Sequence, residues 1–264
     1  NNTYVIPHVV RFFKDKEIVH VKNNLSPVDD FCDINSELIL ADINTIEKYL
    51  KRLEKSRFND KEKNKLISEL SLLLDYLNND NFASSFKFSE DIFKLNDLIL
   101  LTKKPMFVIA NINNDTEESD LADFQKKLHS SIKMITIDVR TETDISGLEN
   151  MERLELLKEM GYGENALDKI INTGYKLLNL KTFFTSGPKE TRAWAAKNDF
   201  NARDCSGIIH TDIKKGFIRA ETVAYDDYIK HNGDQGSKSG GAWRQEGKDY
   251  VVQEGDVIYF RFNL

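Results

Sequence analysis

The chain has 264 residues, 40% of them hydrophobic and 30% charged, which suits two or three domains of an ordinary globular protein. Its net charge of −6 excludes a grip on nucleic acid through overall charge and leaves only a local basic patch for such a role; no DNA partner is expected. No apolar run reaches the roughly 18 residues of a membrane-spanning helix, so no membrane role is expected.

Cys32 and Cys205 have no histidines at zinc-site spacing, and we expect two reduced thiols in a cytoplasmic protein, with no metal site.

The chain begins with a strand-like segment and then a helix start. Residues 7–13 (PHVVRFF) form an apolar run of strand length. Pro27 suits the first position of a helix, with Ser26 as its N-cap. Asp29 and Asp30 fall in the first turn, where carboxylates favour the helix dipole, and apolar residues then recur at helical spacing.

Two further helical segments, 43–55 and 60–77, each carry apolar residues along one side. Such stripes are typical of a helical hairpin or coiled-coil arm; a groove for a partner is the alternative. Residues 78–85 predict a polar turn, and residues 90–102 (EDIFKLNDLILLT) predict a helix that returns to the sheet.

A β-α-β unit follows. Residues 105–110 (PMFVIA) form a continuous apolar run, as expected for a buried parallel strand. Residues 120–131 predict a helix and residues 133–139 (KMITIDV) predict the next strand. This order indicates one right-handed crossover of a doubly wound sheet.

Two helices, 149–160 and 164–179, complete this part of the chain. Gly161 and Gly163 stand between them and suit helix-end and turn positions.

The last 85 or so residues have a different pattern, in which short strands alternate with turns and short helices. The strand-like runs are 180–185, 191–197, 217–225 and 257–262, and the helix-like pieces are 204–212 and 225–231. Four strands with helices on one face predict a small α+β module of the β-grasp type. The Gly-rich segment 233–241 predicts a flexible loop.

Several long motifs resemble a known family. RAW at 192–194, SGIIHTDIKKGFIRAE at 206–221 and EGKDYVVQEGDVIYFRFNL at the end resemble the C-terminal TGS domain of the YchF family, the Obg-like ATPases. SPVDDFCDINSELILADINTIEKYLKRLEK at 26–55 and PHVVRFF resemble earlier parts of the same family. The resemblance implies a chain that begins after the family's phosphate loop and both switch regions and that ends at its natural C-terminus.

The fold that the resemblance implies is α/β plus α+β. Residues 1–24 and 105–150 correspond to part of a doubly wound P-loop G domain, and residues 25–104 to an inserted helical, coiled-coil arm. Residues 151–178 correspond to linker helices, and residues 179–264 to a β-grasp TGS domain.

The sequence contains no G-x-x-x-x-G-K-[ST], the motif whose backbone amides cradle phosphates and whose hydroxyl binds Mg²⁺. The spacing in GDQGSKSGG at 233–241 does not match it. We therefore assign no catalytic residue. The family's cofactors, ATP or GTP with Mg²⁺, and its hydrolysis of them are implied only for a complete chain.

One half of a nucleotide site is implied by the loop that follows the strand 105–110. Here the family carries N-x-x-E against the base, and this chain reads Asn111, Ile112, Asn113 and Asn114. Asn111 matches, but an amide at Asn114 cannot reproduce the acceptor-only pattern of a carboxylate, so ATP and GTP both stay open. A second base-facing loop has a small pair in the family and Asp138–Val139 here. The alternative for Asn111 is an ordinary turn residue at a strand end.

A basic surface is the second candidate site. Lys214, Lys215 and Arg219 lie in and around the segment KKGFIRAE, and Arg192 and Trp194 lie upstream of it. Basic residues interleaved with aromatics can hold phosphates and stack bases. The family implies ribosome or RNA association. The alternative is a solvated lysine pair in a tight turn.

The sequence thus predicts an Obg-like nucleotide-binding protein that associates with the ribosome or RNA. The competing hypothesis is a non-enzymatic adaptor that binds RNA or protein through the TGS module and the helical arm.

Overall fold

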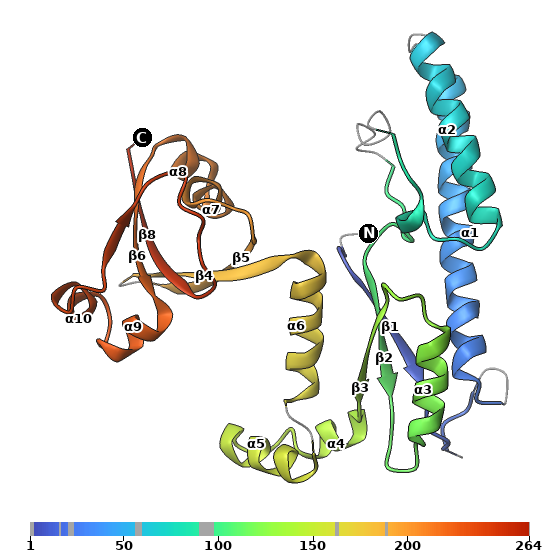
Figure 1. The fold of residues 1–264 in the computed structure, drawn as a ribbon, viewed down its shortest axis with the longest axis horizontal. Helices are drawn as coiled ribbons and strands as arrows, with labels where there is room; N and C mark the ends of the chain where they lie inside the picture. Colours follow the sequence, from blue (N-terminus) through green and yellow to red (C-terminus); the bar gives the residue numbers. More distant parts are fainter. Residues whose placement is uncertain are drawn as a thin grey trace. The chain divides into compact units, whose positions relative to one another are not determined.

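The computed structural model describes residues 3–15, 17–20, 24–55, 60–89, 98–161, 164–187 and 190–263. The chain divides into two compact units, Asn1–Thr173 and Gly174–Leu264 (Figure 1). Among the helices of the described ranges, none is both long and apolar enough to cross a membrane.

The first unit contains a parallel sheet of three strands, in the order β1 (Ile6–Arg11), β2 (Met106–Asn111) and β3 (Lys133–Ile137). Helix α3 (Glu118–Lys127) connects β2 to β3. All of β2 except Asn111 is buried, which explains its continuous apolar sequence. The predicted α/β order of this region is therefore confirmed.

A helical hairpin, α1 (Pro27–Glu54) and α2 (Asp60–Asn78), is inserted between β1 and β2 (Figure 1). Where we expected separate helices up to residue 55, α1 is one continuous helix of 28 residues. Pro27 begins it as predicted, but the Ser26 hydroxyl makes no capping hydrogen bond. The two helices share a core of aliphatic residues that includes Ile39, Ile46, Leu53, Leu66, Leu70, Leu73 and Leu77.

We predicted a helix for residues 90–102, and for residues 98–102, which the structure describes, the prediction is wrong. Residues 98–102 form an irregular segment, and residues 90–97 lie outside the described ranges. The predicted turn before it includes a short 3-10 helix, η1 (Ala83–Ser85). Tertiary hydrogen bonds to the irregular segment replace helical ones, because the Asp42 carboxylate accepts the backbone N–H groups of Leu101 and Thr102.

Three helices follow the sheet: α4 (Val139–Asp144), α5 (Asn150–Glu159) and α6 (Ala166–Leu178). The sequence analysis placed Val139 in a strand and missed α4. Gly161 has a φ of 83°, in agreement with the turn expected there, and Gly163 lies outside the described residues.

The second unit contains a mixed five-stranded sheet in the order β5-β4-β8-β6-β7. Its strands are β4 (Leu180–Ser186), β5 (Thr191–Lys197), β6 (Phe217–Ala224), β7 (Arg244–Glu246) and β8 (Asp256–Phe262). The pair β4–β8 is parallel and the others are antiparallel. The four predicted strands are present, and β7 was missed because three residues carry too little pattern.

Helices α7 (Ala202–Ile209) and α8 (Thr211–Lys215) replace the single predicted piece at 204–212. Cys205 on α7 packs with Phe183 and Ile258 in the core of this unit, where burial raises the pKa of the thiol to about 11. Helix α9 (Tyr225–Lys230) lies where a helical piece was predicted, and its first residue, Tyr225, contacts Phe184.

Two expectations for this unit are wrong. The segment expected to be a flexible loop contains helix α10 (Asp234–Ser239), which starts after Gly233 at a φ of 98°. The helices also contact both faces of the sheet, because Phe184 and the core residue Phe183 are successive in β4 and therefore point to opposite faces.

Candidate functional site

The carboxyl ends of β1, β2 and β3 meet at one edge of the first unit's sheet, because the strands are parallel. In the strand register, Arg11 lies beside Asn111, and Asn111 lies beside Ile137. The three loops that follow these strands therefore share one edge, the place where open α/β sheets bind ligands.

Asn111 joins all three loops. Its backbone carbonyl accepts the N–H of Phe12 at 2.9 Å, from the loop after β1. Its side-chain Oδ1 accepts a long hydrogen bond of 3.5 Å from the N–H of Val139. The next residue, Ile112, donates its N–H to Ile137 at 2.9 Å. The structure thus brings the two predicted base-facing loops together.

Asn113 shapes the loop rather than facing outward. Its Oδ1 accepts the N–H of Asp115 and the hydroxyl of Thr116, both at 3.1 Å. Its own N–H donates to the Thr116 hydroxyl at 3.0 Å. Asn114, at the position where the sequence analysis noted a replaced carboxylate, is exposed. Of the four predicted residues, Asn111, Ile112 and Asn113 are half-buried and Asn114 is exposed.

The carboxylate of Asp138 is committed to local structure. It is buried, and it accepts the N–H and the hydroxyl of Thr141 at 3.1 and 2.8 Å. These bonds make Asp138 the N-cap of α4. The backbone N–H of Val139 is therefore the group of this loop that contacts Asn111.

Arg11, which the sequence analysis did not select, organises the loop after β1. Its guanidinium donates to the carbonyls of Phe13, Asp15 and Ile18 at 2.8, 3.3 and 3.1 Å. The available signal was a cation at the end of an otherwise apolar strand. Such a residue needs several acceptors when it is partly buried.

The four predicted basic residues of the second unit do not form one cluster. Lys214 and Lys215 lie on α8 and contact carboxylates, Lys214 at 2.9 Å from Asp204 and Lys215 at 3.8 Å from Asp212. Arg192 lies on the edge strand β5, where its guanidinium carbon is 4.2 Å from the ring centroid of Trp194.

Arg219 belongs to a different group of charges on β6 and β8. It lies 3.3 Å from Glu221, and Arg261 donates to both oxygens of that carboxylate at 3.0 and 2.9 Å. The Arg261 hydrogen bond is the main cause of the lowered pKa of Glu221. Two strands, β4 and β8, separate β6 from β5, so Arg219 and Arg192 are far apart in the sheet order.

Three further polar residues of the second unit, one histidine and two aspartates, lie at helix N-termini. His210 is exposed, and its Nδ1 accepts the N–H of Asp212 as the N-cap of α8. Asp226 and Asp227 lie in the first turn of α9, where carboxylates favour the helix dipole. In the parts of the chain that the structure describes, no group of three or more His, Cys, Asp or Glu could hold a metal ion.

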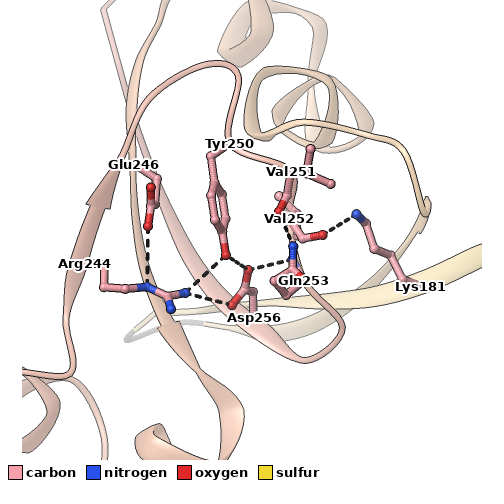
Figure 2. Close-up of polar contacts among 8 residues, drawn as sticks. All are labelled: Lys181, Arg244, Glu246, Tyr250, Val251, Val252, Gln253 and Asp256. Atoms are coloured by element: carbon pink, nitrogen blue, oxygen red, sulfur yellow. Dashed lines mark hydrogen bonds and ion pairs between the residues drawn. The ribbon is translucent and has the colours of Figure 1, made fainter.

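A network that the sequence analysis missed holds the loop before β8 (Figure 2). Tyr250 donates its hydroxyl to the buried Asp256 at 2.8 Å, and burial raises the pKa of Tyr250. Arg244 contacts Asp256 at 3.4 Å and Glu246 at 3.5 Å, and the N–H of Gln253 donates to Asp256 at 2.8 Å. The network joins β7, the loop before β8 and β8 itself, so its role is structural.

The parallel sheet of the first unit and the mixed sheet of the second define a mixed α/β protein of two units. A family model, YchF-GTPase_C, described as a protein of unknown function (DUF933), matches residues 180–263. "Ribosome-binding ATPase YchF" of Haemophilus ducreyi is 41% identical over 99% of this chain and 74% of its own length. The protein of the same name from Bacillus subtilis is 42% identical over 98% of this chain and 73% of its own length.

Solved structures agree with these sequence relatives. The Schizosaccharomyces pombe YchF GTPase covers 97% of this chain at 27% identity, with a TM-score of 0.78, and 72% of that chain is covered. A GTP-binding protein from Pyrococcus horikoshii, at 18% identity and a TM-score of 0.59, shares the fold; the match covers 98% of this chain and 79% of that chain. The chain belongs to the YchF family.

Proposed function

We propose that this chain is a YchF-type nucleotide-binding protein that associates with the ribosome, and hence acts in the cytoplasm. The observation that carries the proposal is the identity of about 40%, over nearly the whole chain, to proteins named ribosome-binding ATPases. These relatives favour a nucleotide-binding protein over the non-enzymatic adaptor.

In this proposal, residues 1–24 and 105–150 are part of a G domain, residues 25–104 its helical arm and residues 151–178 the linker helices. Residues 179–264 are a TGS domain with a β-grasp fold. The mixed sheet of the second unit, with β4 parallel to β8, supports the β-grasp assignment.

The proposed base site is the loop of Asn111, Ile112, Asn113 and Asn114. The edge fits a base, because the half-buried amide of Asn111 lies between two loops and keeps its Nδ2 group as a donor. The Val139 side chain is 48% exposed beside it and offers an apolar surface. Mg²⁺ would accompany the phosphates of ATP or GTP.

Calorimetric titration with ATP, GTP and their nucleosides, each with Mg²⁺, tests this site. We expect binding that Asn111→Ala weakens about fivefold, because one polar contact to a base contributes roughly 1 kcal/mol. Asn44→Ala, at an exposed position of α1, is the control and should bind as the parent does. No heat from any of the four compounds, or equal affinities of parent and Asn111→Ala, would contradict the base site.

Co-sedimentation with ribosomes tests the proposed partner. Lys214→Glu combined with Lys215→Glu should weaken binding and change its salt dependence, since each lost phosphate contact lowers the salt slope. Lys48→Glu combined with Lys51→Glu, on α1, is the charge-matched control. Unchanged co-sedimentation of the α8 variant would remove Lys214 and Lys215 from the contact, and a parent chain that does not sediment would contradict ribosome association.

A further inference from the structure

The two edges of the second unit's sheet differ in how well they are protected from pairing with another strand. One edge is β7, which has only three residues and pairs with Ala220, Glu221 and Thr222 of β6. The other edge, β5, has seven residues in unbroken register with β4. It contains no proline, so β5 lacks the short length, bulge or proline that natural edge strands use against pairing.

The pattern of hydrogen-bonded pairs between β4 and β5 shows which backbone groups of β5 point away from β4. Gly187 donates its N–H to the carbonyl of Glu190, and Asn198 donates its N–H to Asn179 at the far end. Because bonded and non-bonded pairs alternate in an antiparallel ladder, the residues between these ends alternate too. The residues whose backbone N–H and C=O point away from β4 are Thr191, Ala193, Ala195 and Lys197.

This outer edge is accessible within the second unit. All four outward-directed residues are exposed. Among the described residues, the one hydrogen bond recorded to their backbone outside the β4–β5 ladder is a local one, from Phe200 N–H to the Lys197 carbonyl. The side chains of Ala193 and Ala195 are small, so they leave the backbone open to an approaching strand.

The charge of the strand indicates what kind of segment fits. The charged residues of β5, TRAWAAK, are Arg192 and Lys197, and both are exposed. They project to opposite faces of the sheet, because Lys197 is the fifth residue after Arg192 and successive side chains of a strand alternate between the two faces. A second copy of β5 would bring four cations together at this edge, whereas a strand with carboxylates opposite Arg192 and Lys197 would pair each cation.

We infer that β5 is a docking site for an extended acidic peptide segment, which adds a sixth strand to the sheet. The partner strand carries two acidic residues spaced as Arg192 and Lys197 are, with β-branched residues between them to lie beside Trp194. Main-chain hydrogen bonds supply the affinity, and the cations supply the selection. This binding goes beyond the proposed nucleotide and ribosome functions and does not depend on either.

The probe is a fluorescein-labelled peptide, GSETVVTEGS, followed by fluorescence anisotropy with the full chain. We expect saturable binding that weakens as salt is added, because the ion pairs are exposed. The charge-reversed peptide GSKTVVTKGS should not bind. No binding of the acidic peptide by the parent chain overturns the inference.

Ala193→Pro tests the backbone contact, because proline removes an N–H that points outward and is tolerated on edge strands. We expect about tenfold weaker peptide binding, the loss of one or two main-chain hydrogen bonds. Ala193→Val keeps the N–H and should bind as the parent does. Parent-like binding by a folded Ala193→Pro chain, checked by circular dichroism, overturns the inference.

If Ala193→Pro does not fold, a variant with the two cations of β5 reversed tests the inference instead. Arg192→Glu combined with Lys197→Glu should lose the acidic peptide and gain GSKTVVTKGS. A swap that leaves both affinities unchanged overturns the inference. Light scattering tests the competing occupant: a parent dimer that Ala193→Pro makes monomeric, with no peptide binding, would assign β5 to a second copy of the chain and overturn the acidic partner.

Discussion

Lys181 on β4 is a lysine buried inside the second unit, with 3% of its surface exposed. Its ammonium donates to the carbonyls of Asn198 at 2.8 Å and Phe200 at 3.4 Å, and to that of Val252 (Figure 2). Burial lowers the pKa of this ammonium, since a charge is costly away from water. One cation thus joins β4 to the turn after β5 and to the loop before β8.

Lys181→Met tests the structural role of this contact. Methionine fills similar space but leaves the carbonyls of Asn198 and Val252 without this donor, while that of Phe200 keeps the N–H of Val252. We therefore expect a loss of about 2 kcal/mol in the free energy of unfolding. Urea unfolding measures it. Lys197→Met, an exposed lysine on the neighbouring strand, should stay within about 0.5 kcal/mol of the parent. Equal stability of the two variants would show that water satisfies the carbonyls.

At the scale of elements, Asp42 connects the middle of α1 to the irregular segment that leads into β2. Its buried carboxylate accepts the N–H of Leu101 at 2.6 Å and the N–H and hydroxyl of Thr102, each at 2.7 Å. The Thr102 hydroxyl in turn accepts the N–H of Ala83 at 3.0 Å. The Asp42 side chain thus connects the helical hairpin to the segment that leads into β2, in addition to the apolar contacts of Phe31 with the strand's core residues.

Asp42→Asn should destabilise this junction. An amide replaces one acceptor oxygen by a donor, which then faces another N–H, so we expect a cost of about 2 kcal/mol. Hydrogen exchange at the amides of Leu101 and Thr102 should become faster. Asp75→Asn, at an exposed position on α2, is the control. Unchanged exchange at both amides would mean that the carboxylate does not hold the segment.

At the scale of the whole molecule, each unit has its own hydrophobic core. The core of the first unit consists of two clusters, one in the helical hairpin and one at the parallel sheet, and Phe82 packs against both clusters. The second unit has a separate core around Phe183, Ala220 and Ile258. Chains with separate cores are expected to unfold in separate cooperative steps.

Two core truncations test this separation by calorimetry. Leu73→Ala should lower only the transition of the first unit and Phe183→Ala only that of the second, each by roughly 3 kcal/mol of stability, because both side chains are fully buried. Leu72 is next to Leu73 in the sequence but is 60% exposed, so Leu72→Ala should leave both transitions in place. A single transition shifted by both truncations would contradict independent units.

Local pattern was sufficient for most elements, and it failed where long-range contacts decide. The continuous apolar run of β2 could be recognised because burial on both faces leaves no polar positions in the strand. The helix expected up to residue 102 failed because Asp42, sixty positions earlier, accepts the backbone donors of Thr102. Periodicity within a short window contains no information about such a partner.

In the candidate site, too, some features could be predicted from the sequence and others depended on long-range contacts. Asn111 could be chosen from the sequence through the resemblance to the YchF family, which carries N-x-x-E in the loop after this buried strand. Its contact with Val139, the use of Asp138 as a helix cap and the separation of Arg192 from Arg219 could not be chosen in this way. Each depends on strand order and register.

The sequence by itself determined the YchF family, the parallel β-α-β order and the positions of most strands, because these depend on motifs and apolar spacing within short stretches. Only the tertiary structure decided that Lys214 contacts Asp204, that Lys181 contacts three carbonyls, and that β5 is an edge strand of the second unit's sheet. The physical reason is that a side chain's partner and a strand's neighbour are chosen by packing across the chain, after the local elements have formed.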